Sequence, residues 1–170
     1  MADTYTTYFN GVAFAAAKNM AMIVNTHATE TIRIYRVGLL NAQTAAVTGV
    51  LCQLELRRYT GAGLTGHTAV VPVKHDTTTP AYASSVIGHA GTPTGTPDVL
   101  RRIFWSSDEA AISTGTLDEW ETMVPLNVIF DTGGDANVSP LILRQGEGIC
   151  VYNTTGAAGL LDTWIESTRV

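Results

Sequence analysis

The chain carries few charges and almost no lysine. Charged residues make up 15% of its 170 residues, against about 25% in an average soluble domain. Lys18 and Lys74 are the only lysines, and the formal net charge is −5, from 10 Lys and Arg against 15 Asp and Glu. A protein held on nucleic acid by phosphate neutralisation needs clustered cations. The composition therefore argues against a nucleic-acid partner.

Long apolar runs and cysteine pairs are scarce as well. No stretch reaches the ~18 consecutive apolar residues that a membrane-spanning helix needs, and the first residues lack the basic and apolar regions of a secretory signal. Cys52 and Cys150 each lie in an apolar run, so they are either two buried free thiols or one bridge between strands. We expect a chain that stays in a reducing cytoplasm, with no membrane partner.

What the chain has in abundance is threonine and alternating hydrophobicity. There are 25 threonines, 16 glycines and 45% hydrophobic residues, a composition typical of strands and turns. In residues 50–58, Cys52, Leu54 and Leu56 alternate with Gln53 and Glu55, which predicts a strand with one buried face. Further strands are expected at residues 20–25, 31–40, 68–73, 100–105, 123–130, 140–144, 148–153 and 160–167.

Clusters of Gly, Asn, Asp and Thr separate these strands. They lie at residues 59–66, 91–97, 131–137 and 154–159, where tight turns are expected. Residues 14–22, 107–112 and 117–122 could each form a short helix or helical turn, although Val and Thr next to the first segment favour a strand there. The prediction is an all-β fold: a single-domain, jelly-roll-like β-sandwich with little helix. It divides into residues 1–22, an N-terminal arm or edge segment, and residues 23–170, the sandwich.

The N-terminal segment is unusually apolar. Residues 1–22 contain Tyr5, Tyr8 and Phe9 but only Asp3 and Lys18 as charges. Such a segment either pairs with the sandwich as an edge strand or buries itself against a neighbouring chain. The three aromatic residues are therefore candidates for binding a partner.

Two arginine pairs, Arg57-Arg58 and Arg101-Arg102, lie within predicted strands. The members of each pair should point to opposite faces, because side chains alternate along a strand. Arginine is enriched in interfaces, where lysine is depleted. The four side chains are either solvated strand charges or anchors for an acidic patch on a partner, and we count all four as candidate partner-binding residues.

Motifs for catalysis or metal binding are weak. Asp131-Thr132-Gly133 follows an apolar run, as in aspartic proteases, but it also fits an ordinary polar turn or a sparse Ca²⁺ loop. The four histidines (His27, His67, His75 and His89) lack the spacing of a metal site. Trp105, Trp120 and Trp164 are expected as core or interface anchors, with a sugar-stacking surface as the alternative. We predict no enzyme, no catalytic residue, no metal and no cofactor.

Residues 140–153 (PLILRQGEGICVYN) give the chain a family resemblance. An apolar strand ending in Arg144, a Gly146-Glu147-Gly148 turn and an apolar return strand resemble structural proteins of tailed bacteriophages. The resemblance implies a virion protein that is assembled in the host cytoplasm. Its function would be to bind and stabilise the capsid as an oligomeric decoration (cement) protein, with a homotrimer favoured and the major capsid protein or another virion protein as partner. The alternative is a head- or tail-associated module that binds a receptor or carbohydrate.

Overall fold

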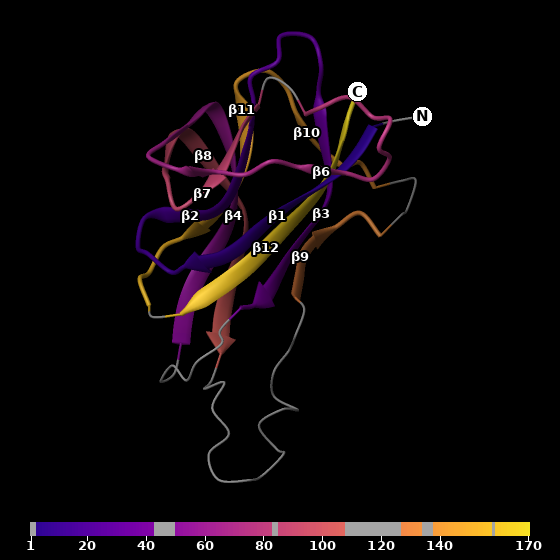
Figure 1. Cartoon of the computed structure of the whole chain (residues 1–170). Helices are drawn as coiled ribbons and strands as arrows, with labels where there is room; N and C mark the ends of the chain where they lie inside the picture. Colours follow the sequence, from indigo (N-terminus) through magenta and orange to yellow (C-terminus); the bar gives the residue numbers. More distant parts are fainter. Residues whose placement is uncertain (1–2, 43–49, 83–84, 108–126, 134–137, 158) are drawn as a thin grey trace, which may run out of the picture.

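The computed structural model describes residues 3–42, 50–82, 85–107, 127–133, 138–157 and 159–170. In these ranges the chain forms two antiparallel β-sheets that pack face to face as a sandwich (Figure 1). This confirms the predicted all-β sandwich. The described residues include no helix that is long and apolar enough to cross a membrane.

Within the described ranges six strands make up each sheet, and the chain crosses between the sheets many times. Sheet A has the order β10-β3-β12-β1-β6, with β9 paired to β3 beside β10. Its strands are β1 (Asp3–Ala13), β3 (Ile32–Asn41), β6 (Val73–Lys74), β9 (Asn127–Asp131), β10 (Leu141–Leu143) and β12 (Leu160–Arg169). Sheet B has the order β5-β7-β2-β11-β4-β8. Its strands are β2 (Lys18–Asn25), β4 (Val50–Thr65), β5 (Thr68–Ala69), β7 (Ser85–His89), β8 (Thr92–Ser107) and β11 (Glu147–Asn153).

The core lies between the two sheets and follows the alternation seen in the sequence. In β4, Cys52, Leu54 and Leu56 are buried in the core, as predicted. In β12, Leu161 and Ile165 are buried there too. Cys52 and Cys150 are both free and buried, which confirms the interpretation as free thiols over that of a bridge.

A second, smaller cluster buries part of the outer face of sheet B. It consists of Met22, Val24, Tyr59, Leu64 and Cys150. Residues 59–65 of the predicted turn 59–66 are instead the end of β4, and most of the predicted turn 91–97 belongs to β8. The two segments pair with each other, for example Gly63 with Thr94. A side chain at position 63 would collide with Thr94, since its Cβ would lie 2.5 Å from the threonine Oγ1.

Residues 14–22 do not form a helix; the strand, the alternative left open for them, forms from Lys18 onward. After a turn at residues 16–17, the chain enters β2, which lies between β7 and β11 in the middle of sheet B. Met20 to Val24 are all buried. A segment that is buried on both faces gains more from pairing and packing on either side than alanine gains from its helical propensity.

The N-terminal residues are part of the sandwich. β1 pairs with β12 along most of its length and with the short β6 on its other side. Of the two predicted alternatives, pairing with the sandwich is therefore the one observed, rather than burial against a neighbouring chain. The proposed boundary after residue 22 falls inside β2. The helices expected at 107–112 and 117–122 lie outside the described residues except for Ser107, which belongs to β8.

Two other predicted strands take a different form. Residues 68–73 split into β5 in sheet B and β6 in sheet A, so the segment around Pro72 crosses between the sheets. The expected hairpin at residues 141–152 is also a crossover: β10 pairs with β3 in sheet A, whereas β11 pairs with β2 and β4 in sheet B. The turn at Gly146, with φ of 75°, reverses the chain while it changes sheets.

Candidate interaction surface

Within each arginine pair, the two side chains point to opposite faces of sheet B, as the alternation predicts. Arg57 and Arg102 lie on the outer face with Glu55, since Glu55 is the direct cross-strand partner of Arg102. Arg58 and Arg101 instead donate to backbone carbonyls of sheet A, and Arg58 also bonds to Glu147 at the start of β11. The four candidate residues therefore have two different roles.

Arg58 and Arg101 hold the sandwich together at one side. Arg101 Nη1 donates to the carbonyl oxygen of Ile129 in β9 at 2.8 Å. Arg58 Nη2 donates to the carbonyl oxygen of Ile142 in β10 at 3.3 Å and to Glu147 Oε1 at 2.8 Å. Both guanidinium groups reach from sheet B to sheet A at one side of the sandwich, where they donate to backbone carbonyl oxygens.

Glu55 is a buried carboxylate on the outer face, and only 4% of its side chain is exposed. Arg57 Nη2 and Arg102 Nη2 lie 2.6 Å and 2.9 Å from its two oxygens, one on each. The Arg57 guanidinium also stacks on the Tyr152 ring, with Cζ 3.6 Å from the ring centroid. Three strands, β8, β4 and β11, therefore contribute to one charged cluster.

The electrostatics of this cluster favour a charged carboxylate. Burial by itself raises the pKa of the Glu55 carboxyl, but the hydrogen bonds and charges of Arg57 and Arg102 outweigh it and lower that pKa below its ordinary value. One negative and two positive charges leave an excess of one positive charge. Arg102 carries this excess to solvent, because 58% of its side chain is exposed.

Exposed apolar side chains surround the cluster on the same face. Leu51 and Phe104 are 65% and 68% exposed, and Val99, opposite Arg57, is also exposed. We call Leu51, Glu55, Arg57, Val99, Arg102 and Phe104 the β4–β8 patch. Aromatic and arginine side chains beside aliphatic ones are the composition that protein–protein interfaces favour.

The three N-terminal aromatic candidates have separate locations. Tyr5 and Phe9 are fully buried between the sheets, so the prediction that they bind a partner is wrong: a strand inside the sandwich turns alternate residues into its core. Tyr8 lies on the outer face of sheet A and is 42% exposed. Its hydroxyl donates to Asp162 Oδ2.

The tryptophans are divided in the same way. Trp105 is buried in the core, as expected of an anchor. Trp164 lies on the outer face of sheet A beside Tyr8, its cross-strand partner. Trp120 lies outside the described residues.

Asp131 has the surroundings of a turn residue. Its Oδ1 accepts from the backbone N–H of Gly133 at 2.8 Å, and its Oδ2 accepts from Arg36 Nε at 3.1 Å. The Gly133 hydrogen bond and the Arg36 charge lower the pKa of Asp131. A shared-proton protease dyad requires the pKa of one carboxyl to be raised, so the geometry supports the interpretation as a polar turn.

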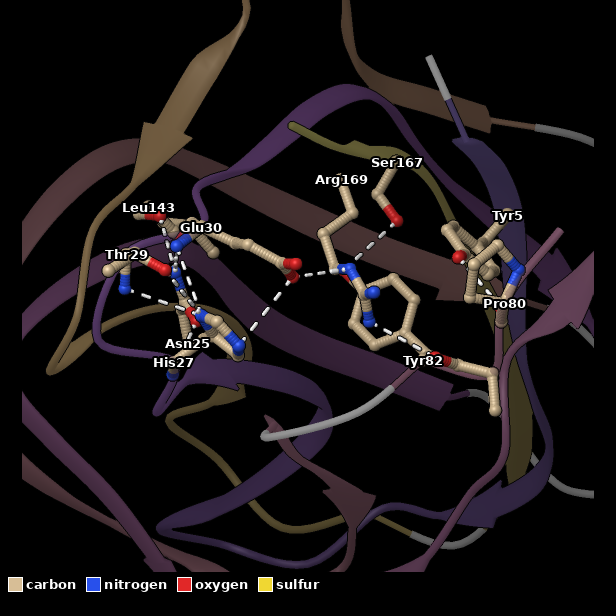
Figure 2. Close-up of polar contacts among 11 residues, drawn as sticks. Tyr5, Asn25, His27, Thr29, Glu30, Pro80, Tyr82, Leu143, Ser167 and Arg169 are labelled. Atoms are coloured by element: carbon tan, nitrogen blue, oxygen red, sulfur yellow. Dashed lines mark hydrogen bonds and ion pairs between the residues drawn. The ribbon is translucent and has the colours of Figure 1, made fainter. Parts of the chain in front are cut away.

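A further polar cluster ties the C-terminal strand to two loops (Figure 2). Arg169 Nε lies 2.6 Å from Glu30 Oε2, and its Nη1 donates to the carbonyl oxygen of Ala81. Asn25 Nδ2 donates to the carbonyl oxygens of Glu30 and Leu143. These partners are all internal, so the cluster stabilises one end of the sandwich. Among the described side chains, no three His, Cys, Asp or Glu residues are grouped to hold a metal ion.

Sequence reasoning missed Leu51, Glu55, Val99 and Phe104. A signal was present for Leu51, because it falls on the polar side of an amphipathic strand, with Gln53 and Glu55. The pairing of β4 with β8, which no local pattern encodes, brings Arg102 and Phe104 beside Glu55 and Gln53 of β4.

Comparison of the chain with protein-family models, with curated proteins and with solved structures finds no match.

Proposed function

We propose that this chain is a non-enzymatic structural protein of a tailed-phage virion, which binds the capsid as an oligomeric decoration protein. On this proposal it is made in the host cytoplasm and works by covering joints between shell subunits. Its partners are the major capsid protein or another virion protein, and further copies of itself in a homotrimer.

The observation that carries the proposal is the β4–β8 patch. It offers a rigid sheet face with two large exposed apolar side chains, Leu51 and Phe104, beside the guanidinium of Arg102. Such a surface suits an acidic and apolar protein partner. A contact of ~800 Å² per partner, repeated around a symmetry axis, gains strength from multivalency even when a single contact is weak.

Strand order supports the finer proposal of a jelly roll. Eight strands follow the orders β1-β12-β3-β10 and β2-β11-β4-β8, and β1 to β4 alternate between the two sheets. Two interlocked Greek keys produce such crossovers. Of the remaining strands, β5 to β7 are inserted between β4 and β8 in the chain, and β9 follows β8 and pairs with β3.

Two measurements test the proposed function. Mass spectrometry of phage particles purified from the host culture should find the chain as a stoichiometric component. Recombinant protein should sediment with particles that lack it, and native mass spectrometry should give a trimer. If the chain is absent from the particles and does not bind them, the proposal is wrong.

Variants locate the contact. The double variant Leu51→Ser/Phe104→Ser should weaken particle binding about tenfold or more, since it removes both apolar anchors. A suitable control is Val71→Ser, because Val71 is 83% exposed and lies in the connection after β5, which forms the edge of sheet B opposite to β4 and β8. Equal binding by the double variant and the control would show that the patch is not the contact.

A further inference from the structure

The outer face of sheet A carries two parallel rows of side chains across four strands, β1, β12, β3 and β9. The first row consists of Tyr8, Trp164, Gly38 and Val128, each the direct cross-strand partner of the next. The second consists of Thr6, Glu166, Arg36 and Asp131, paired in the same way. Directly paired residues share a face, so an aromatic row lies beside a charged row (strands in Figure 1).

Gly38 sets the position of the Trp164 ring. A Cβ at position 38 would lie 1.9 Å from Trp164 Cζ2 and 2.0 Å from Cη2. The benzene half of the indole therefore rests directly on the backbone of β3. The ring of the partly buried Trp164 extends the aromatic row from Tyr8 towards Val128, which is 37% exposed.

Tyr8 is held in place by a buried carboxylate. Asp162 is 6% exposed and accepts from the Tyr8 hydroxyl and from the backbone N–H of Gly11. The hydrogen bond to Asp162 raises the pKa of Tyr8 to about 12, so the phenol stays protonated at neutral pH. Both aromatic side chains are thus ordered before any ligand arrives, which lowers the entropic cost of binding.

The charged row is ordered as well. Arg36 lies between two carboxylates, with Nε 3.1 Å from Asp131 Oδ2 and Nη1 3.6 Å from Glu166 Oε2. All three side chains are partly exposed, at 41%, 35% and 32%. They present both donors and acceptors to a ligand that lies along the aromatic row.

We propose that this face binds a neutral glycan chain, with pyranose rings lying over Tyr8 and Trp164 and their hydroxyl groups bonded to Arg36, Asp131 and Glu166. A pyranose has an apolar C–H face and a rim of hydroxyls, which matches an aromatic row beside a polar one. Asp131, Glu166 and Asp162 against Arg36 and Arg33, which also lies on the outer side of β3, leave this face with a net charge of −1, which disfavours phosphates and acidic polymers. The site is separate from the β4–β8 patch and does not depend on the proposed capsid contact.

The test uses the full chain on an array of neutral and acidic oligosaccharides of four to eight pyranose units, followed by calorimetry with the neutral oligosaccharides that bind. Trp164→Leu removes the aromatic face but keeps an apolar cover on Gly38, and circular dichroism checks that the variant folds. Phe104→Leu is the matched control, because it removes an exposed aromatic ring from the other sheet. Glu166→Gln, a conservative change in the charged row, provides a second variant.

We expect at least one neutral oligosaccharide to bind, Trp164→Leu to weaken this binding about tenfold, Glu166→Gln to weaken it severalfold, and Phe104→Leu to leave it unchanged. The proposal is overturned if no neutral oligosaccharide binds at millimolar concentration, or if Trp164→Leu and Phe104→Leu have equal effects. It is also overturned if Trp164→Leu dissociates an oligomer of the chain, because the face would then be covered by a second copy. Loss of particle binding in a Phe104 variant with glycan binding intact tests the capsid contact alone.

Discussion

Replacing Glu55 with glutamine tests the charged cluster on the outer face of sheet B. The carboxylate has one oxygen for each guanidinium, Arg57 on Oε2 and Arg102 on Oε1. Glutamine has a similar shape but offers one acceptor and one N–H₂ donor. The donor faces a guanidinium that is itself only a donor, so Glu55→Gln leaves one arginine without its partner.

The expected loss in the free energy of unfolding follows from how exposed each arginine partner is. Breaking a buried ion pair by removing one member costs about 3–5 kcal/mol, whereas an exposed pair is worth about 0–1 kcal/mol. Arg57 is 17% exposed and Arg102 58%, so water can solvate Arg102 but hardly Arg57. We expect a loss of about 3 kcal/mol, at the low end of the buried range, which for a chain of this size corresponds to a fall in Tm of about 6–12 °C.

The pH dependence has a definite sign. The folded-state pKa of Glu55 lies below its ordinary value, so its contribution to stability is present above the unfolded pKa of about 4.3 and is lost as the pH falls through the folded pKa. Urea unfolding followed by circular dichroism, at pH 7 and at points below pH 4, should therefore show wild type and Glu55→Gln converging in acid.

Glu166→Gln serves as the matched control, because the Glu166–Arg36 pair is partly exposed and should contribute under about 1 kcal/mol. A Glu55→Gln variant as stable as wild type at pH 7 would show that the carboxylate does not stabilise the two arginines. A difference between the two proteins that stays constant as the pH is lowered would show that it does not arise from the ionisation of Glu55.

Four further predictions concern other parts of the sandwich. Gly38→Ala should lower the free energy of unfolding by about 1–3 kcal/mol, measured by thermal unfolding, because its Cβ would collide with the Trp164 ring; an unchanged Tm would mean that the ring moves freely. Arg101→Met should lower the free energy of unfolding by about 0.5–1.5 kcal/mol in a urea titration, since the carbonyl oxygen of Ile129 loses a donor from an exposed side chain, and a change under about 0.5 kcal/mol would contradict its role in joining the sheets. A thiol reagent should modify Cys52 and Cys150 only after unfolding, because burial raises the pKa of both thiols, and reaction of the native protein would refute this. The raised pKa values of Tyr8 and Tyr82 predict stability that is present below pH ~10 and declines at higher pH, as those phenols ionise more easily in the unfolded chain; chemical unfolding between pH 8 and 12 would detect the decline, and Tyr8→Phe should reduce it.

The sequence predicts which face of a strand each candidate residue occupies, but not the partners that it contacts. Alternation within a strand correctly separates Arg57 from Arg58 and Arg101 from Arg102, because neighbouring side chains in a strand point to opposite faces. It does not reveal that one member of each pair reaches across to sheet A, since β9 and β10 lie far from β4 and β8 in the sequence. The N-terminal aromatic residues Tyr5, Tyr8 and Phe9 are a second example. Their spacing in a strand places Tyr5 and Phe9 on one face and Tyr8 on the other, but only the packing of the second sheet makes the first face the core.

Local pattern also fails where burial on both sides outweighs propensity. The alanine-rich start of residues 14–22 suggests a helix, yet β2 is enclosed by β7 and β11 within sheet B. The Gly- and Thr-rich segments around residues 63 and 94 suggest turns, yet they pair with each other because the missing side chain of Gly63 admits Thr94. In both places a distant segment supplies the stabilising contact.

Composition and the two-residue period alone determine that this chain forms strands with one apolar face, and hence a sandwich. The reason is that the hydrophobicity of each side chain decides whether it is buried or exposed to solvent. Which strands become neighbours is decided in three dimensions, where loop closure, sheet crossover and side-chain fit select one pairing among many. The Glu55–Arg57–Arg102 cluster and the row of Tyr8, Trp164 and Gly38 exist only through that pairing. Their chemistry therefore belongs to the tertiary structure.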